Sequence, residues 1–328
     1  MRLMGWTGGL AAAGLVLAAC GGGPSGGGGA ISDDKVVLAV LNDQSGIYSD
    51  TSGRKTVDAV KLAVEDFKAK HGDKVVTKNI EVVSADHQNK PEIANSKAQE
   101  LYDRQKADLI VDVPTSSAAF AVANIAKTKK KVFIDVGAAS TELTGKQCNK
   151  YTFHYGYNSY MLAHGTGTEV TKAVGKNWYI VYPDYAFGQD MEKTFAEAIK
   201  AAGGTVVKSD PTPFPNDNFS TFLLKAPDLN PKPNVLGTMH AGGDLVNLVK
   251  QYNQYKLRDK NVSLAVGLLA LSDIDSLGSD ALAGTHYTDM WYWNMDDQAK
   301  AWADKFKQKT GQRPTANMAG NYSAALQY

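Results

Sequence analysis

The stretch Leu109-Ile110-Val111-Asp112-Val113-Pro114-Thr115-Ser116-Ser117 contains the unit from which this chain is built. An apolar run rich in Val and Ile is typical of a buried strand, and here it ends in small polar residues that precede a helical segment. The same order recurs at 132–141, where an apolar run leads into Gly137-Ala138-Ala139-Ser140-Thr141. Strands and helices that alternate with short connections predict parallel β-sheets covered by helices on both faces.

Similar apolar runs extend through the chain. Further strands are expected at 36–41, 80–83, 178–182, 205–207, 235–239 and 264–271, with an aromatic strand at 287–293. Helices are expected at 57–67, 92–102, 118–127, 161–174, 189–202, 245–255 and 296–309, and another begins at 317. Residues 151–160 interrupt the alternation and indicate a crossing between two halves. The strands form either one wide sheet or two smaller ones.

Residues 1–20 predict export from the cytoplasm. One basic residue, Arg2, precedes an apolar stretch at 10–19 that is too short to span a bilayer. The stretch ends in Leu17-Ala18-Ala19-Cys20, which resembles the lipobox of bacterial lipoproteins. We therefore expect a signal peptide at 1–20, lipid on Cys20 and a glycine-rich tether at 21–32, which would place the protein in the periplasm or on the outer cell surface. A plain signal peptide is the alternative.

The overall composition argues against nucleic-acid binding and membrane spanning. Lys and Arg number 35 against 34 Asp and Glu, and the longest basic run is Lys129-Lys130-Lys131. No later segment offers the roughly eighteen apolar residues that a membrane span needs, so only the N-terminal lipid would contact a membrane. The two cysteines, Cys20 and Cys148, leave no disulfide framework if lipid occupies the first.

Sequence motifs that carry catalysis are missing. The sequence holds no Gly-x-x-x-x-Gly-Lys-Ser/Thr loop, no Gly-x-Ser-x-Gly turn between a strand and a helix, and no His-Glu-x-x-His pair. Gly165-Thr166-Gly167 lacks the third glycine of a dinucleotide fingerprint. A metal site built from His87, His154 and His240 is less expected than three structural histidines. We therefore expect neither an enzyme nor a bound cofactor or metal.

Small and polar residues follow four of the expected strands at their carboxyl ends, where open α/β sheets bind ligands. These loops are 114–117, 137–141, 183–188 and 240–244. Serine hydroxyls and backbone N–H groups at a helix N-terminus suit a carboxylate, and Tyr185 and Phe187 offer flat apolar walls. The alternative is that Thr115, Ser116 and Ser140 only cap helices.

Several stretches together resemble the leucine/isoleucine/valine-binding family of solute receptors, which serve ABC importers. They are Leu41-Asn42-Asp43-Gln44-Ser45-Gly46-Ile47-Tyr48, Ala85-Asp86-His87-Gln88-Asn89-Lys90-Pro91, Asp112-Val113-Pro114-Thr115-Ser116-Ser117 and Asp184-Tyr185-Ala186-Phe187-Gly188. The resemblance runs in order from 36 to 328 and is closest to a branch that includes receptors for aromatic carboxylates. It implies a type I periplasmic binding protein fold of the α/β class, with two doubly wound parallel-sheet lobes joined by a hinge.

The resemblance also implies a division of the chain. One lobe would hold 33–156 and 287–328, and the other would hold 157–286. Members of the family usually continue for several dozen residues through a third crossover, so we expect the chain to be truncated at its C-terminus. A monomer that hands its ligand to an ABC transporter permease, with no cofactor, is implied as well.

Carried over residue by residue, the resemblance implies a carboxylate grip in the first lobe. The gripping serine matches Ser116, with Ser117 beside it. The backbone of the next loop matches 137–139, with Ser140 as the nearest hydroxyl. Phe187 matches an aromatic lid from the second lobe.

Two positions depart from the amino-acid receptors of this family. Ala241 replaces a tyrosine, and Leu269 lies near the position of the glutamate that neutralises an ammonium group, so the next acid is Asp273. Because a buried ammonium without a counter-charge is costly, we expect a small organic acid with an aromatic or apolar body. Asp184 or Asp244 could substitute for the glutamate, which leaves a branched-chain amino acid or an amide as the alternative. The expected ligand-binding residues are Tyr48, Ser116, Ser117, Ala138, Ala139, Ser140, Tyr185, Phe187, Ala241 and Leu269.

Overall fold

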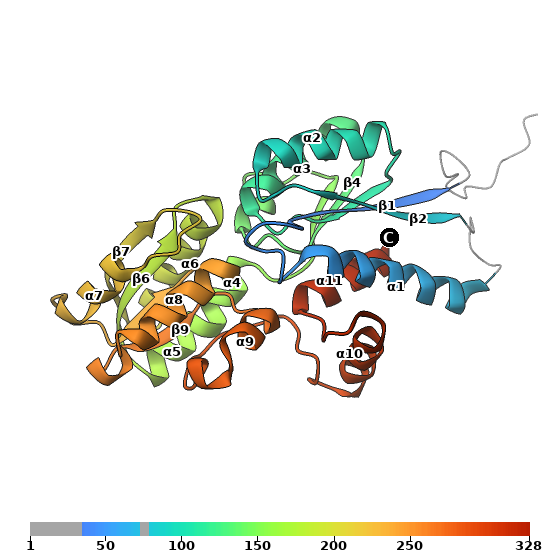
Figure 1. Ribbon diagram of the computed structural model, residues 1–328. Helices are drawn as coiled ribbons and strands as arrows, with labels where there is room; N and C mark the ends of the chain where they lie inside the picture. Colours follow the sequence, from blue (N-terminus) through green and yellow to red (C-terminus); the bar gives the residue numbers. More distant parts are fainter. Residues whose placement is uncertain (1–34, 73–78) are drawn as a thin grey trace, which may run out of the picture.

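The computed structural model describes residues 35–72 and 79–328, and the strands in these ranges form two parallel sheets (Figure 1). The first sheet has the strand order β2-β1-β3-β4-β5 and the second has the order β7-β6-β8-β9. The predicted α/β class is confirmed, and of the two arrangements that the sequence left open, two smaller sheets is correct. The predicted signal peptide, Cys20 and the tether at 21–32 lie outside the described residues.

Most strands lie close to the predicted ranges; β5 was not predicted, and β7 and β9 end at other residues than predicted. The strands are β1 (Val36–Asn42), β2 (Ile80–Asp86), β3 (Leu109–Asp112), β4 (Val132–Asp135), β5 (Thr152–His154), β6 (Asn177–Pro183), β7 (Thr205–Thr212), β8 (Val235–Thr238) and β9 (Ser263–Val266).

The helices between them are α1 (Gly53–His71), α2 (Pro91–Asp103), α3 (Ser116–Lys129), α4 (Ser159–Leu162), α5 (Thr168–Ala173), α6 (Ala186–Ala201), α7 (Ser220–Lys225), α8 (Gly242–Gln254), α9 (Leu271–Leu277), α10 (Asp297–Thr310) and α11 (Ala316–Gln327). A single π-helical stretch, Ala163–Gly167, joins α4 to α5. In the described ranges, no helix combines the length and the apolarity that a bilayer crossing requires.

The five-stranded sheet is buried on both faces. Val37, Ala39 and Leu41 of β1 pack with α2 and α3, while the intervening Leu38 and Val40 pack with α1 and α11. The alternation follows from the two-residue period of a strand. Figure 1 shows α2 and α3 on one side of this sheet and α1 and α11 on the other. We call the sheet with α1–α3, α10 and α11 the first lobe.

The four-stranded sheet is built in the same way. Trp178 and Ile180 of β6 belong to one apolar cluster with α6, while Tyr179 and Val181 belong to another with α7 and α8. We call this sheet with α4–α9 the second lobe. Since every strand in each sheet is parallel, all loops that follow the strands emerge at one edge of their sheet.

The described chain passes between the lobes near 155–158 and again near 283–296. Both lobe boundaries that the family resemblance implied, 156/157 and 286/287, fall in these passages, and we retain them as a proposal. The second passage holds the aromatic residues that we predicted to form a strand at 287–293. That prediction is wrong, because no residue of 287–293 lies in a strand and the one nearby bridge is made by His286 with Ala265. Trp291 packs on Trp302 of α10, and Trp293 packs under Arg313 of the following loop.

Two further predictions require correction. The segment 151–160 was expected to be only a crossing, yet it contributes the short edge strand β5, which pairs with β4. The strand expected at 264–271 ends at Val266, and α9 begins at Leu271. The apolar residues between them line a loop instead, because the Asp273 carboxylate accepts a hydrogen bond from Ala270 N at 2.9 Å and so starts the helix there.

The buried aromatic residues of the second lobe should dominate its stability. Phe195 of α6 is fully buried, whereas Phe153 of β5 is 53% exposed. We expect Phe195→Ala to lower the free energy of unfolding by about 3–5 kcal/mol, because the cavity left behind cannot fully collapse. Phe153→Ala, the matched control, should change it by less than about 0.5 kcal/mol. Urea denaturation measures both, and equal effects would contradict this assignment of the core.

Candidate functional site

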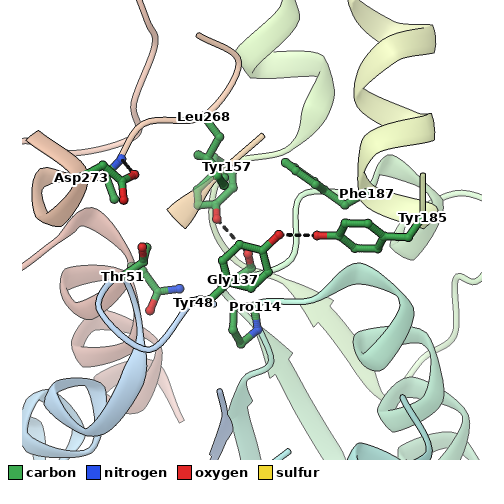
Figure 2. Close-up of a pocket in the computed structure, with 12 residues that line it drawn as sticks. Tyr48, Thr51, Pro114, Gly137, Tyr157, Tyr185, Phe187, Leu268 and Asp273 are labelled. Atoms are coloured by element: carbon green, nitrogen blue, oxygen red, sulfur yellow. Dashed lines mark hydrogen bonds between the residues drawn. The ribbon is translucent and has the colours of Figure 1, made fainter. Parts of the chain in front are cut away.

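The loops at the carboxyl ends of both sheets meet in a cleft between the lobes and enclose a small cavity. Figure 2 shows the side chains that surround it. The lining residues are Tyr48, Thr51, Pro114, Gly137, Tyr157, Tyr185, Phe187, Ala241, Leu268, Ala270, Asp273 and Asn317. The cavity holds only about 20 Å³, close to the space of one water molecule. An aromatic guest, which needs about 150 Å³, therefore requires these side chains to part.

The aromatic side of the cavity joins the two lobes. The hydroxyl groups of Tyr48, from the first lobe, and Tyr185, from the second, are hydrogen-bonded at 2.5 Å (Figure 2). Phe214 stacks on Tyr185 with ring centroids 4.3 Å apart, and Phe187 lies 5.8 Å from the same ring. Burial raises the pKa of both tyrosines, so each phenol stays protonated at neutral pH and acts as a neutral partner.

The opposite side of the cavity is polar. Figure 2 shows Asp273 and Thr51 across the cavity from Tyr185 and Phe187. The Asp273 side chain is 3% exposed, and desolvation raises the pKa of its carboxyl group to about 7. A carboxyl group poised in this way can accept a hydrogen bond from a cationic or hydroxyl group, or donate one when it is protonated. The cavity is therefore aromatic at one end and acidic at the other.

The turn after β3 positions the floor of the cleft. Asp112 and Val113 adopt left-handed φ angles of 83° and 66°, which end the strand one residue earlier than predicted. The buried Asp112 carboxylate accepts hydrogen bonds from Ser52 at 2.5 Å and from Asn317 Nδ2 at 3.0 Å. These bonds tie β3 to the segment before α1 and to α11, so that Pro114 and Asn317 reach the cavity.

The polar groups expected to grip a carboxylate are engaged with one another. Ser116 Oγ accepts a hydrogen bond from Ser140 N at 3.3 Å, and Ser140 Oγ accepts one from Glu142 N at 3.3 Å. Asp135 Oδ2 accepts a hydrogen bond from Ala138 N at 3.2 Å. In this closed arrangement Ser116 and Ser140 fix the loops 114–117 and 137–141 relative to each other.

The predicted site residues thus fall into two groups. Tyr48, Tyr185, Phe187 and Ala241 line the cavity. The residues that do not line it are Ser116, Ser117, Ala138, Ala139, Ser140 and Leu269. Leu269 is 2% exposed and packs in the core of the second lobe, because its neighbour Leu268 takes the cavity-facing position.

Sequence reasoning missed several residues of the site. Thr51, Tyr157 and Asn317 line the cavity but were not singled out, and neither was Phe214, which stacks on Tyr185. Asp273 was noted only as the next acid after Leu269. Phe214 follows β7, but the predicted strand stopped at 207 instead of Thr212, which hid the fact that this residue lies at a strand end. A strand predicted to extend to Thr212 would have identified Phe214 as a residue of a strand-end loop.

The three histidines considered for a metal site bond to different partners, and His87 Nδ1 accepts a hydrogen bond from Asn89 N at 3.0 Å. His240 is buried between the hydroxyls of Thr238 and Thr212, at 2.9 and 2.8 Å, and desolvation lowers its pKa to about 3. His154 Nε2 lies 2.8 Å from the carbonyl oxygen of Ala138. Within residues 35–72 and 79–328, no three His, Cys, Asp or Glu side chains gather as metal ligands would.

Close approach of the lobes depends on a glycine at the start of α8. Gly242 has a φ of 58°, and a Cβ atom placed there would lie 2.5 Å from the carbonyl oxygen of Ile47 in the first lobe. The neighbouring Gly243 N donates a hydrogen bond to that oxygen at 3.3 Å. A side chain at Gly242 would therefore hold the lobes apart.

Residues 35–328 match the family described as periplasmic binding protein. The chain belongs to this family. A periplasmic binding protein from Burkholderia mallei is 41% identical, with a TM-score of 0.84, and the match covers 90% of this chain and 77% of that one. These findings confirm the family resemblance and the type I periplasmic binding protein fold inferred from the sequence.

Two further solved structures carry more specific descriptions. A branched chain amino acid ABC transporter periplasmic ligand-binding protein from Burkholderia xenovorans is 35% identical, with a TM-score of 0.75 and coverage of 89% of this chain and 77% of that one. A solute binding protein of an ABC transporter from Rhodopseudomonas palustris, in complex with 3,4-dihydroxybenzoic acid, is 25% identical, with a TM-score of 0.76 and coverage of 89% and 78%.

The curated relatives are more distant. The Leu/Ile/Val-binding protein homolog 6 of Brucella melitensis is 26% identical over 225 residues, which are 68% of this chain and 57% of the relative. The chain thus spans little more than half the length of the curated relatives that it matches.

Gly242→Ala should prevent full closure of the lobes, because the new methyl group would clash with the Ile47 carbonyl. We expect a larger radius of gyration by small-angle X-ray scattering. Gly203→Ala is the matched control, since Gly203 also has a positive φ, of 81°, but has nothing within 4 Å of the added carbon. A Gly242→Ala protein as compact as the control would contradict the role of Gly242.

Asp273→Asn should change how stability depends on pH. The folded protein holds the Asp273 proton up to a pKa of about 7, whereas the unfolded chain releases it near the ordinary value of 3.8. The free energy of unfolding that the native aspartate contributes therefore falls as pH rises from about 4 to 7, whereas an asparagine, which does not titrate, contributes no such change. Urea denaturation measures the free energy of unfolding of both proteins. From pH 4 to pH 8, the value for the variant should rise relative to that of the native protein by on the order of a few kcal/mol. A constant difference would contradict the raised pKa.

Proposed function

We propose that this protein is the extracytoplasmic solute-binding receptor of an ABC importer and captures a small aromatic or apolar carboxylate between its lobes. One observation carries the proposal: three aromatic side chains from both lobes, Tyr48, Tyr185 and Phe187, meet around a single cavity. Rings from opposite lobes can sandwich a flat guest, and the guest then bridges the lobes. Such a cleft binds its solute without transforming it.

A carboxylate could be held at the start of α3. This helix begins at Ser116 and has 14 residues, so its N-terminus carries partial positive charge beside the cleft. Ser116 Oγ accepts the N–H of Ser140 and can still donate its own hydroxyl proton to a carboxylate. Ser116, Ser117 and the backbone of 138–140 remain the proposed grip. The 3,4-dihydroxybenzoic acid in the Rhodopseudomonas palustris relative supports a ligand of this class.

The second candidate is an amino acid, and Asp273 is the observation that favours it. The sequence suggested that no acid would face the ligand, yet the Asp273 carboxyl lines the cavity. Its negative form could balance an ammonium group at the polar end of the cavity. The description of the Burkholderia xenovorans relative as a branched chain amino acid transporter protein supports this alternative.

The partners follow from the family and remain part of the proposal. A receptor of this kind delivers its ligand to a transporter permease, and the Leu17-Ala18-Ala19-Cys20 motif would hold it at a membrane through lipid. We propose a monomer in the periplasm or on the outer cell surface, with no cofactor.

A ligand panel read by thermal shift tests the proposal. Benzoate and 3,4-dihydroxybenzoate represent the carboxylates, leucine represents the amino acids, and benzamide represents the neutral amides. A true ligand at about a hundred times its dissociation constant should add ~2.7 kcal/mol of stability. Stabilisation by leucine that Asp273→Asn abolishes would select the second candidate, and no stabilisation by any of the four would contradict both.

Phe187→Ala should weaken binding of 3,4-dihydroxybenzoate by about 1.5–3 kcal/mol, because one apolar wall of the cavity is lost. Isothermal titration calorimetry measures this change. Phe222→Ala provides the control, since Phe222 packs in the second lobe without lining the cavity. If both variants bind as the native protein does, the ligand does not lie against Phe187.

A further inference from the structure

Asp190 links the two lobes at a point outside the cavity. It lies on α6, three residues after Phe187, and its side chain is 8% exposed. Its Oδ2 atom accepts a hydrogen bond from Thr141 N at 2.9 Å, and its Oδ1 atom accepts one from the Thr141 hydroxyl at 2.8 Å. Thr141 belongs to the first lobe, so one carboxylate makes both bonds across the cleft.

The partner of Asp190 is a backbone group that has no acceptor within its own lobe. Thr141 begins a short 3-10 turn, Thr141–Leu143, and the first N–H groups of a helical turn have no partner inside it. The hydroxyl of the cap residue Ser140 accepts the N–H of Glu142, and its carbonyl accepts the N–H of Leu143. Asp190 therefore completes this turn from the opposite lobe, and it can do so only when the lobes are closed.

The other hydrogen bonds that cross the cleft away from the lobe connections are between neutral groups in the described chain. They join the hydroxyls of Tyr48 and Tyr185, the hydroxyls of Thr51 and Ser272 at 3.4 Å, and Gly243 N to the Ile47 carbonyl. Ser159 at the start of α4 also donates to the Ala139 carbonyl, from its backbone N at 2.8 Å and from its hydroxyl at 3.0 Å. A hydrogen bond to a charged group contributes more to stability than one between neutral groups. The Asp190 carboxylate is therefore the strongest single candidate for stabilising closure.

The position of these bonds connects closure to the ligand site. Thr141 ends the loop whose Ala139 packs among side chains of the second lobe. Asp190 and Phe187 lie one helical turn apart on α6, so they share a face of the helix. Holding Thr141 against Asp190 thus fixes the 137–141 loop and the Phe187 wall relative to each other.

We propose that Asp190 is a positioning residue for solute capture: it clamps Thr141 across the cleft, favours the closed lobes and prolongs ligand residence without touching the ligand. The clamp follows from contacts in the ligand-free protein, whereas its effect on residence rests on the proposed function. The two parts are tested by separate measurements.

Small-angle X-ray scattering of the ligand-free protein tests the clamp alone. Asp190→Ala should increase the radius of gyration, because the closed form loses both bonds. Glu192→Ala is the matched control: Glu192 lies on the same helix but accepts its hydrogen bond from Ser209 at 2.6 Å within the second lobe. Asp190→Asn and Thr141→Val each keep part of the clamp, so their radii of gyration should lie between those of the native protein and Asp190→Ala. These two variants replace Asp190→Ala in the test if that protein does not fold.

Stopped-flow binding of 3,4-dihydroxybenzoate tests the effect on residence. Asp190→Ala should raise the dissociation rate about tenfold or more and leave the association rate nearly unchanged. Thr141→Val, which loses only the hydroxyl bond, should raise the dissociation rate less, by about two- to tenfold. A merely structural role would instead lower the unfolding free energy with no change in this rate.

The outcomes separate the clamp from the proposed function. If no panel compound binds the native protein but Asp190→Ala is more open than Glu192→Ala, the clamp stands and the proposed ligand class fails. If Asp190→Ala, Asp190→Asn and Thr141→Val all scatter like the native protein, the clamp is overturned, whatever binds in the cleft. Unchanged dissociation in these variants would overturn the proposed effect of the clamp on ligand residence.

Discussion

The packing of Tyr48 against the second lobe is the contact on which the site depends. Tyr48 belongs to a first-lobe loop, yet its buried ring packs in the apolar cluster of the second lobe with Phe187 and Met239. Its hydroxyl meets that of Tyr185, and together the two rings leave a cavity of only about 20 Å³. The side chains proposed to hold a ligand therefore also contact one another across the lobes, so a guest in this cavity must replace those contacts.

The parallel sheets explain why these residues meet. In each lobe every described strand ends at the same edge, and the two edges face one another across the cleft. Loops that follow β1, β3 and β4 supply one wall, and loops that follow β6, β7, β8 and β9 supply the other. Most residues that line the cavity, together with Gly242 and the Asp190 bonds, lie on these loops or at the starts of the helices after them, so the cavity and the contacts between the lobes share one region.

The sequence was sufficient for the fold class and for three aromatic residues that line the cavity, Tyr48, Tyr185 and Phe187. Alternating apolar runs identify parallel strands, and Tyr185 and Phe187 stand directly after β6, where a strand end is easily recognised. The polar half was harder to predict. Ser140 N donates its hydrogen bond to Ser116 Oγ. Leu268, and not Leu269, faces the cavity, and the start of α9 brings Asp273 to it. Each outcome depends on the direction of a side chain in an irregular loop, which a periodic pattern does not encode.

The crystal structure of the complex with whichever panel compound stabilises the protein most tests the central claim most directly. The account predicts the compound between Tyr48, Tyr185 and Phe187, with the two phenol hydroxyls separated and the lobes closed around it. A saturated complex that keeps the Tyr48–Tyr185 hydrogen bond and carries its ligand elsewhere would contradict it.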